Sequence, residues 1–163
     1  MAHGPHKLRL RFLDGLVDLD WLFIEKLDRV VSLQANTGGF LSARSGGGLD
    51  VKTDAPSAAI WEELTFDDLN GGSLVDGDVI DIQVLDGLYL TVGAGQVVSA
   101  DQRATSPATE FTIVVQGGGT FGDGAKIALE SSDKAHYLTA SPPNELDASG
   151  TSVGAAQTFT VGF

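Results

Sequence analysis

The stretch Phe40-Leu41-Ser42-Ala43 decides how this chain folds, because it occurs three times. It returns as Tyr89-Leu90-Thr91-Val92 and as Tyr137-Leu138-Thr139-Ala140, each time an aromatic residue, a leucine, and two short side chains. The leucines stand at positions 41, 90 and 138, which are 49 and 48 residues apart. Self-similarity at a fixed spacing of this size indicates a fold built from repeated units.

Other apolar positions share the spacing, with separations of 47 to 49 residues. They are Leu33, Ile82 and Leu129; Val51, Val98 and Leu146; Leu64, Phe111 and Phe159; and Phe66, Ile113 and Val161. An apolar side chain that returns at the same place in every unit is typical of a core position. We therefore expect these residues to be buried.

Each unit alternates short apolar segments with turns. In the first unit the turns are Asn36–Gly39 and Gly46–Gly48, and the segments between them have the period of two that is typical of strands. This pattern predicts four strands per unit and twelve in all. No four-stranded unit could bury its own apolar face, so we expect the units to pack together as one domain.

Three four-stranded repeats of about 47–49 residues predict an all-β fold, the β-trefoil, over residues 29–163. In this fold six strands close a barrel and three hairpins cap one end, which removes exposed sheet edges. The predicted repeats are residues 29–74, 75–121 and 122–163. A three-bladed propeller is the alternative, but so few blades close a ring poorly.

Residues 1–28 lie outside the repeat and form an N-terminal extension, whose first six residues resemble an expression tag. Asp14-Gly15 predicts a hairpin turn, whereas the apolar spacing from Leu16 onward fits a short helix equally well. Either would pack over the barrel. The alternative is self-association through residues 16–24, which contain a dense apolar run.

The composition limits the partners. Ten Lys and Arg against 22 Asp and Glu give a formal charge of −12, which disfavours nucleic acid and anionic membrane surfaces. The chain has no cysteine, and so no disulfide or thiolate metal site. No run is apolar enough for membrane insertion or for an export signal, so the chain as encoded is expected in the cytoplasm.

The sequence gives little sign of catalysis, and we expect neither an enzyme nor a cofactor nor a metal. Of three histidines, only His136 lies within the repeats, at a predicted hairpin surface. The acidic pairs at Asp76-Gly77-Asp78 and Asp67-Asp68 are typical of turns, with a weak calcium site as the alternative. Residues 117–122 match a Gly-x-Gly-x-x-Gly pattern, but predicted strands on both sides make the match accidental.

Over roughly residues 29–163 the chain resembles the fascin-like and hisactophilin-like trefoils, which are actin-crosslinking-like domains, most fully in its first unit. The residues that carry the resemblance are Gly39–Ala43, Gly46–Gly48, Val51–Asp54 and Trp61–Leu64. The later units depart from it, with alanine in the place of Trp61. The Gln-x-Trp signature of ricin-type trefoils is absent. The resemblance implies a β-trefoil and an actin-binding or crosslinking role.

Recognition through the trefoil loops is the function that we expect. The candidate ligand-binding residues lie in the hairpin turns and in the polar loops after each third strand. They are Asn36, Asp54, Trp61, Asp86, Asp101, Asp133 and His136. The alternative for each aspartate is turn chemistry, and for Trp61 it is core packing.

Trp61 near Asp54 combines an aromatic face with a polar acceptor, as sugar sites do. The leading hypothesis is therefore a non-catalytic, lectin-like module that binds a glycan. A protein partner is the alternative, either actin filaments bound by a fascin-like crosslinking domain or the target of an inhibitor-type trefoil.

Overall fold

The computed structural model describes residues 29–48 and 50–163. The predictions for residues 1–28, including the hairpin at Asp14-Gly15 and self-association through residues 16–24, lie outside the described residues.

Twelve strands follow one another in three groups of four, as the repeats predict. The first group is β1 (Arg29–Ala35), β2 (Phe40–Ala43), β3 (Val51–Ala55) and β4 (Leu64–Asp68). The second is β5 (Val79–Gln83), β6 (Tyr89–Val92), β7 (Val98–Gln102) and β8 (Glu110–Val115). The third is β9 (Lys126–Ser131), β10 (Tyr137–Ser141), β11 (Glu145–Gly150) and β12 (Phe159–Gly162).

The first and fourth strands of the three groups form a closed antiparallel barrel. Its strands pair in the order β1–β4–β5–β8–β9–β12, and β12 returns to pair with β1. The last pairing sets Leu33 opposite Val161. Because every barrel strand has two neighbours, no barrel edge is left for another strand to join. This closure confirms the predicted all-β, β-trefoil fold.

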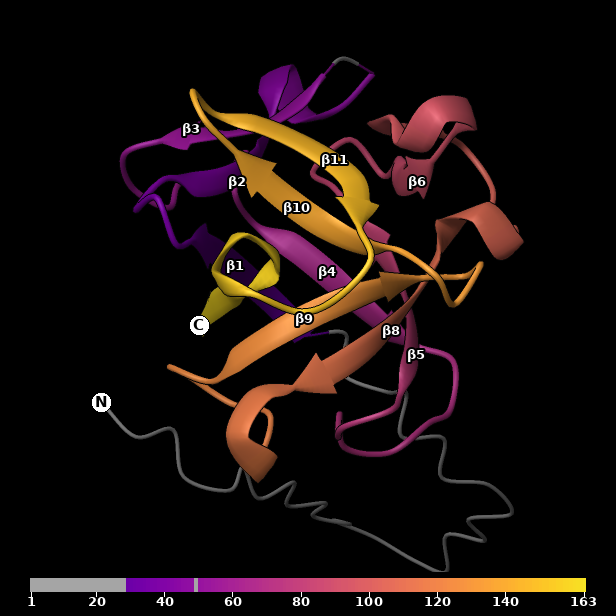
Figure 1. Ribbon diagram of the computed structural model, residues 1–163. Helices are drawn as coiled ribbons and strands as arrows, with labels where there is room; N and C mark the ends of the chain where they lie inside the picture. Colours follow the sequence, from indigo (N-terminus) through magenta and orange to yellow (C-terminus); the bar gives the residue numbers. More distant parts are fainter. Residues whose placement is uncertain (1–28, 49) are drawn as a thin grey trace, which may run out of the picture.

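The second and third strands of each group form hairpins, β2–β3, β6–β7 and β10–β11, which meet over one end of the barrel. Figure 1 shows β10 and β11 lying above the barrel strands β8 and β9. Short bridges tie the hairpins together: Glu145 pairs with Lys52, Asp50 with Ser99, and Val97 with Asp147. Lys52 Nζ also lies 2.7 Å from Glu145 Oε1.

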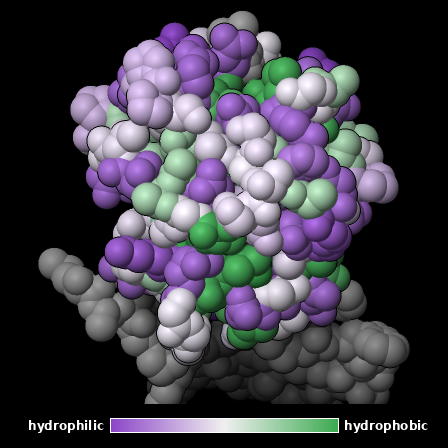
Figure 2. Space-filling model, viewed as in Figure 1, coloured by the Kyte–Doolittle hydropathy of each residue, from purple (hydrophilic) through white to green (hydrophobic). Residues whose placement is uncertain are grey.

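The repeated apolar positions form the core, as expected. All fifteen, including the three leucines Leu41, Leu90 and Leu138, are 6% exposed or less. The fully buried aromatic rings are Phe66, Phe111 and Phe159, all on barrel strands. Figure 2 shows a largely polar face on which strongly apolar residues gather in the lower half. The spacing therefore identified both the strands and the side of each strand that faces inward.

The glycine-rich stretch at residues 117–122 joins two antiparallel strands, β8 and β9. A dinucleotide site needs a strand, a glycine-rich turn and then a helix, and only a three-residue 3-10 helix (Gln116–Gly118) occurs here. The resemblance to that motif is accidental, as predicted. Within residues 29–48 and 50–163, no helix has the length and apolar character to cross a bilayer.

Candidate functional site

The loop before each fourth strand is held by the same contact in all three repeats, made each time by a different residue type. Glu62 Oε2 accepts a hydrogen bond from the Ala59 backbone N–H at 2.9 Å. Its equivalents Thr109 and Gln157 accept from the backbone N–H groups three residues earlier, at 3.0 and 3.1 Å. Such caps satisfy backbone donors that the short helical turn leaves free. The loop backbone is thus fixed.

This cap decides where Trp61 points. Glu62 turns inward and is 4% exposed, whereas the neighbouring Trp61 is 46% exposed. The Trp61 carbonyl accepts the Ala43 N–H at 3.1 Å, which ties the loop to the end of β2. The core-packing alternative for Trp61 is therefore wrong. Its indole stands at the surface on a fixed backbone.

A groove of about 570 Å³ opens beside Trp61. Its lining includes Asp54, as the sequence suggested, and it combines apolar and polar groups. The lining residues are Ser42, Arg44, Ser45, Asp54, Ala55, Pro56, Ser57, Ala59, Trp61 and Glu62. The structure thus places the predicted pair, Asp54 and Trp61, on the walls of one groove.

Arg44 is a groove residue that the sequence reasoning missed. It lies in the 3-10 turn after β2 (Arg44–Gly46), and its guanidinium makes an ion pair with Asp54. The Arg44 side chain is 49% exposed and that of Asp54 is 26% exposed, so both remain open to a ligand. The ion pair fixes the carboxylate and adds nitrogen donors beside its oxygen acceptors. A register shift between β2 and β3 in this hairpin is not visible in the repeat spacing.

The equivalent position in the second repeat lacks the aromatic wall. Ala108 stands in the place of Trp61, and its carbonyl accepts a hydrogen bond from Thr91 Oγ1 at 3.0 Å. Asp101, the counterpart of Asp54, is exposed and accepts from Gln102 Nε2 at 2.9 Å.

The third repeat also differs. Ala156 replaces the tryptophan, and Ser149 donates to Asp147 Oδ1 at 2.7 Å. Gln157 Nε2 donates to Thr139 Oγ1 at 3.1 Å, which holds the loop against β10. The three loops therefore share the backbone contact before the fourth strand but present different side chains at the surface. The aromatic and charged combination occurs in the first repeat.

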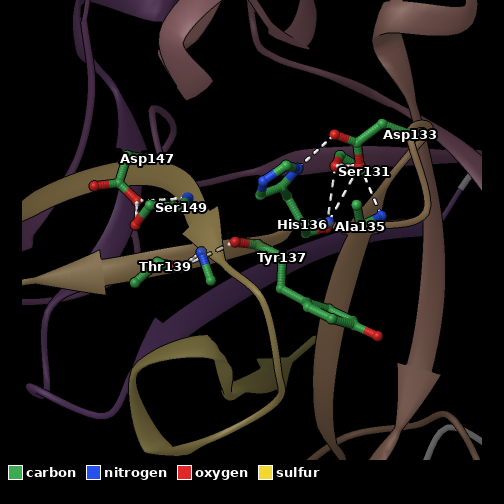
Figure 3. A network of polar contacts seen from close by, with 9 residues as sticks. Ser131, Asp133, Ala135, His136, Tyr137, Thr139, Asp147 and Ser149 are labelled. Carbon is green, nitrogen blue, oxygen red and sulfur yellow. Dashed lines mark hydrogen bonds and ion pairs between the residues drawn. The ribbon is translucent and has the colours of Figure 1, made fainter.

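Asp133 and His136 come together in the turn between β9 and β10 (Figure 3). Asp133 Oδ2 lies 2.5 Å from His136 Nδ1, and Asp133 Oδ1 accepts from the Ala135 N–H at 2.9 Å and from Ser131 Oγ at 2.8 Å. The backbone N–H of Ala135 first, and then the His136 ring, lower the pKa of Asp133 from 3.8 to about 2. These contacts organise the turn and place His136 at the hairpin surface, as predicted.

Two further candidates lie apart from the Trp61 groove. Asn36, in the β1–β2 turn, lines a separate groove of about 470 Å³ together with Gln116 and Lys126. Asp86 lies against Gly46 and donates its backbone N–H to the Gly46 carbonyl at 3.0 Å. The predicted residues are thus spread over the molecule and do not form one site.

The carboxylates of the two acidic pairs accept backbone N–H groups, two of them in their own turns and one from β8. Asp78 Oδ2 accepts the Val75 N–H at 2.7 Å, and Asp76 Oδ1 accepts the Val115 N–H at 2.7 Å. Asp68 Oδ1 accepts the Asn70 N–H at 2.8 Å. Across the described part of the chain, no group of three or more His, Cys, Asp or Glu is arranged to hold a metal. The turn interpretation accounts for Asp68 and Asp78, whereas Asp76 links this loop to the end of β8.

Solved structures with the same fold extend this description. The chain is similar to an SDF2-like protein from Arabidopsis thaliana, with 14% identity, a TM-score of 0.69, and coverage of 81% of this chain and 91% of that one. It is also similar to ThreeFoil, a designed threefold-symmetric protein, with 15% identity, a TM-score of 0.66, and coverage of 82% and 98%. The fold is that of a β-trefoil.

A Caenorhabditis elegans protein of unknown function is a third structural neighbour of this trefoil. It has 18% identity, a TM-score of 0.68, and coverage of 82% of this chain and 93% of that one. No protein-family model and no curated protein sequence matches the chain. Identities this low establish the fold and leave the ligand open. The resemblance of the first repeat to fascin-like trefoils stays a prediction.

Proposed function

We propose that this trefoil is a non-catalytic binding module that recognises carbohydrate through the groove of its first repeat. The observation that carries the proposal is the exposed indole of Trp61 on the wall of a groove that also holds Asp54 and Arg44.

The chemistry of this groove suits a sugar ring. The C–H face of a pyranose is apolar and stacks on an aromatic face, while its hydroxyl groups need directed donors and acceptors. Trp61 supplies the face, Asp54 supplies acceptors, and Arg44 and Ser57 supply donors. The Arg44–Asp54 ion pair holds the two charged groups in place before a ligand arrives. Little ordering is then needed on binding.

The charge of the groove favours a neutral ligand over an acidic one. Asp54 and Glu62 line it with a single cation, Arg44, and the whole chain carries a formal charge of −12. Arg44 is already paired with Asp54. A carboxylated or sulfated sugar would therefore meet net repulsion, whereas a neutral oligosaccharide would not.

The contacts of Ser131 support the non-catalytic part of the proposal, because its hydroxyl is not paired with the neighbouring histidine ring. A serine nucleophile needs a histidine within hydrogen-bond reach of its hydroxyl. Ser131 instead donates to Asp133, and His136 Nδ1 binds the other oxygen of the same carboxylate (Figure 3). Both side chains are directed to Asp133 and hold the turn.

The second candidate is binding to actin filaments, which the resemblance of Gly39–Ala43 and Trp61–Leu64 to fascin-like trefoils favours. Filaments are acidic, and a module with a charge of −12 is repelled by them at long range. Bundling also needs two filament sites on one short chain. Glycan recognition is therefore the stronger proposal.

The test is a glycan array probed with the full chain, followed by calorimetric titration of each hit. A hit on neutral glycans that is lost in Trp61→Ala supports the proposal. Ile60→Ala is the matched control, because Ile60 is the adjacent residue, is 58% exposed, and does not line the groove. A blank array, or equal affinity in both variants, overturns the site. Actin co-sedimentation then tests the second candidate.

A further inference from the structure

Two buried side chains, Leu74 and Phe121, close the end of the barrel away from the hairpins. Leu74 lies in the connection from β4 to β5 and is 4% exposed, and Phe121 lies in the connection from β8 to β9 and is 8% exposed. The ring of Phe121 packs 6.1 Å from that of Phe66 in the barrel core. We name these two residues the barrel plugs.

The two connections repeat each other residue for residue. Ile82 is sixteen positions after Phe66, and Leu129 is sixteen positions after Ile113. Each plug stands at the midpoint, eight residues after one core position and eight before the next. The threefold arrangement of the barrel thus has a plug position in each sector, and the connections fill two of the three.

The third sector lies between β12 and β1, the last and first strands of the trefoil, and no described connection crosses it. Its apolar side chains are exposed, unlike the plugs: Val30 is 50% exposed and Phe163 is 60% exposed. A groove of about 250 Å³ runs between these two residues and Ala58 and Ala59 of the loop after β3.

This groove adjoins the plugs. The ring of Phe163 meets that of Phe121 edge-on, with centroids 6.2 Å apart. Arg29, the first residue of β1, lies with its guanidinium 5.8 Å from the same Phe121 ring. The third sector therefore continues the apolar layer that Leu74 and Phe121 begin, and the chain enters the barrel beside it.

We propose that residues 16–24 of this chain bind in the third sector and supply its missing plug. This segment contains the apolar run Trp21-Leu22-Phe23-Ile24. The position eight residues before Leu33 is Glu25, which directly follows that run and is charged, so the apolar run and not this counterpart residue is the part that would fill the sector. Arg29 is five positions after Ile24 in the sequence, a reach of about 17 Å when extended. The segment is thus long enough to reach the groove and apolar enough to fill it.

The short tether favours the chain's own segment over that of a second copy. A segment joined to its site by a few residues has an effective concentration in the millimolar range. A second molecule reaches that concentration only in a very concentrated solution. Binding within one chain is therefore expected at ordinary protein concentrations.

The test uses Trp21 as a probe. The chain has two tryptophans, Trp21 and Trp61, so Trp61→Phe leaves Trp21 alone. In the full-length variant we expect Trp21 emission to be blue-shifted and acrylamide quenching to be several-fold weaker than in the same chain unfolded in urea. Trp21 that is quenched as readily as in the unfolded chain overturns the proposal.

Substitutions in the groove locate the binding site. In the Trp61→Phe background, Val30→Ser or Phe163→Ser is expected to shift Trp21 emission to the red while the far-ultraviolet spectrum of the strands is kept. Val97→Ser is the matched control, because Val97 is 60% exposed in the loop before β7, among the hairpins. An equal shift of Trp21 emission in all three variants would show that residues 16–24 do not bind at the groove beside Val30 and Phe163.

A dilution series distinguishes binding of the segment within its own chain from binding to a second molecule. Protection of Trp21 that is constant from micromolar to submillimolar protein, in a monomer by light scattering, supports the proposal. Protection that falls on dilution together with a dimer shows that residues 16–24 bind a second molecule, and overturns it. Neither readout depends on glycan binding.

Discussion

The Asp86 carboxylate fills the space beside Gly46 where the β-carbon of any other residue would lie. Such a β-carbon would stand 2.7 Å from Asp86 Oδ1, and Gly46 has a φ of +88°. The Asp86 N–H donates to the Gly46 carbonyl at 3.0 Å. The β5–β6 turn of the second repeat is therefore docked on the β2–β3 hairpin of the first.

Gly46→Ala is expected to lower the free energy of unfolding by about 2 kcal/mol, because it adds a steric clash to a left-handed backbone. Gly95→Ala is the control. Gly95 also has a positive φ, +72°, but nothing lies within 4 Å of its β-carbon position, so we expect a loss of about 1 kcal/mol. Urea unfolding followed by circular dichroism measures both.

The double variant Gly46→Ala/Asp86→Ala isolates the clash. Removal of the carboxylate gives the new methyl group room, so the double variant is expected to lose less than the sum of the two single variants. Additive losses would show that the two residues do not interact, which would contradict the docking of the second repeat on this hairpin.

The cap of the Trp61 loop gives a second prediction. Glu62→Ala removes the acceptor of the Ala59 N–H, at 2.9 Å, and is expected to cost about 1 kcal/mol of stability. Glu62→Gln keeps the acceptor and the volume but not the charge, and Gln157 performs the same role in the third repeat. We expect Glu62→Gln to be nearly neutral. Equal losses in both variants, measured by urea unfolding, would mean that the charge of Glu62 matters and the cap does not.

The repeat spacing predicted the strands and the core because both depend on local alternation and on threefold recurrence. Leu33, Ile82 and Leu129 recur as apolar residues, so the spacing finds them. Glu62 and Thr109 occupy equivalent positions and make the same contact through different side chains. A search for matching residue types does not detect such a pair, whereas alignment of the repeats by position would.

The groove was harder to predict, because it depends on contacts between segments. Asp54 was singled out for its residue type, but its partner Arg44 lies ten residues earlier, across a hairpin with a register shift. Trp61 is exposed because the neighbouring Glu62 turns inward. Both residues precede β4, and period-two alternation predicts which side chains face inward only within a strand. The need for glycine at position 46 could not be predicted from the first repeat either, because the group that crowds Gly46 is Asp86 of the second repeat.

The turn at Asp133 predicts a specific dependence on pH. Hydrogen bonds from Ala135 and His136 lower the pKa of Asp133 from 3.8 to about 2, so the folded state favours the ionised carboxylate. The resulting stability is present above pH 3.8 and is lost as the pH falls through about 2. Because the carboxylate is 45% exposed, solvent screening keeps the contribution to about 1 kcal/mol or less.

Asp133→Asn tests this dependence. The amide keeps an oxygen for the Ala135 N–H but does not ionise, so it is expected to be less stable than the parent at pH 5. The difference should shrink steadily between pH 4 and pH 2, where the parent carboxylate becomes protonated. Urea unfolding at several pH values measures it. A difference that is constant over this range would show that the charge of Asp133 does not stabilise the turn.

Trp61 separates binding from stability. Because its indole is 46% exposed and its backbone is fixed by the neighbouring cap, Trp61→Ala is expected to change the free energy of unfolding by about 0.5 kcal/mol or less. Glycan affinity should fall at least tenfold, about 1.4 kcal/mol, because the stacking face is lost. Trp61→Phe keeps part of that face and should fall between the parent and the alanine variant. Titration of one array hit against all three proteins measures this order. A phenylalanine variant as weak as alanine would mean that the indole N–H, and not the ring face, holds the ligand.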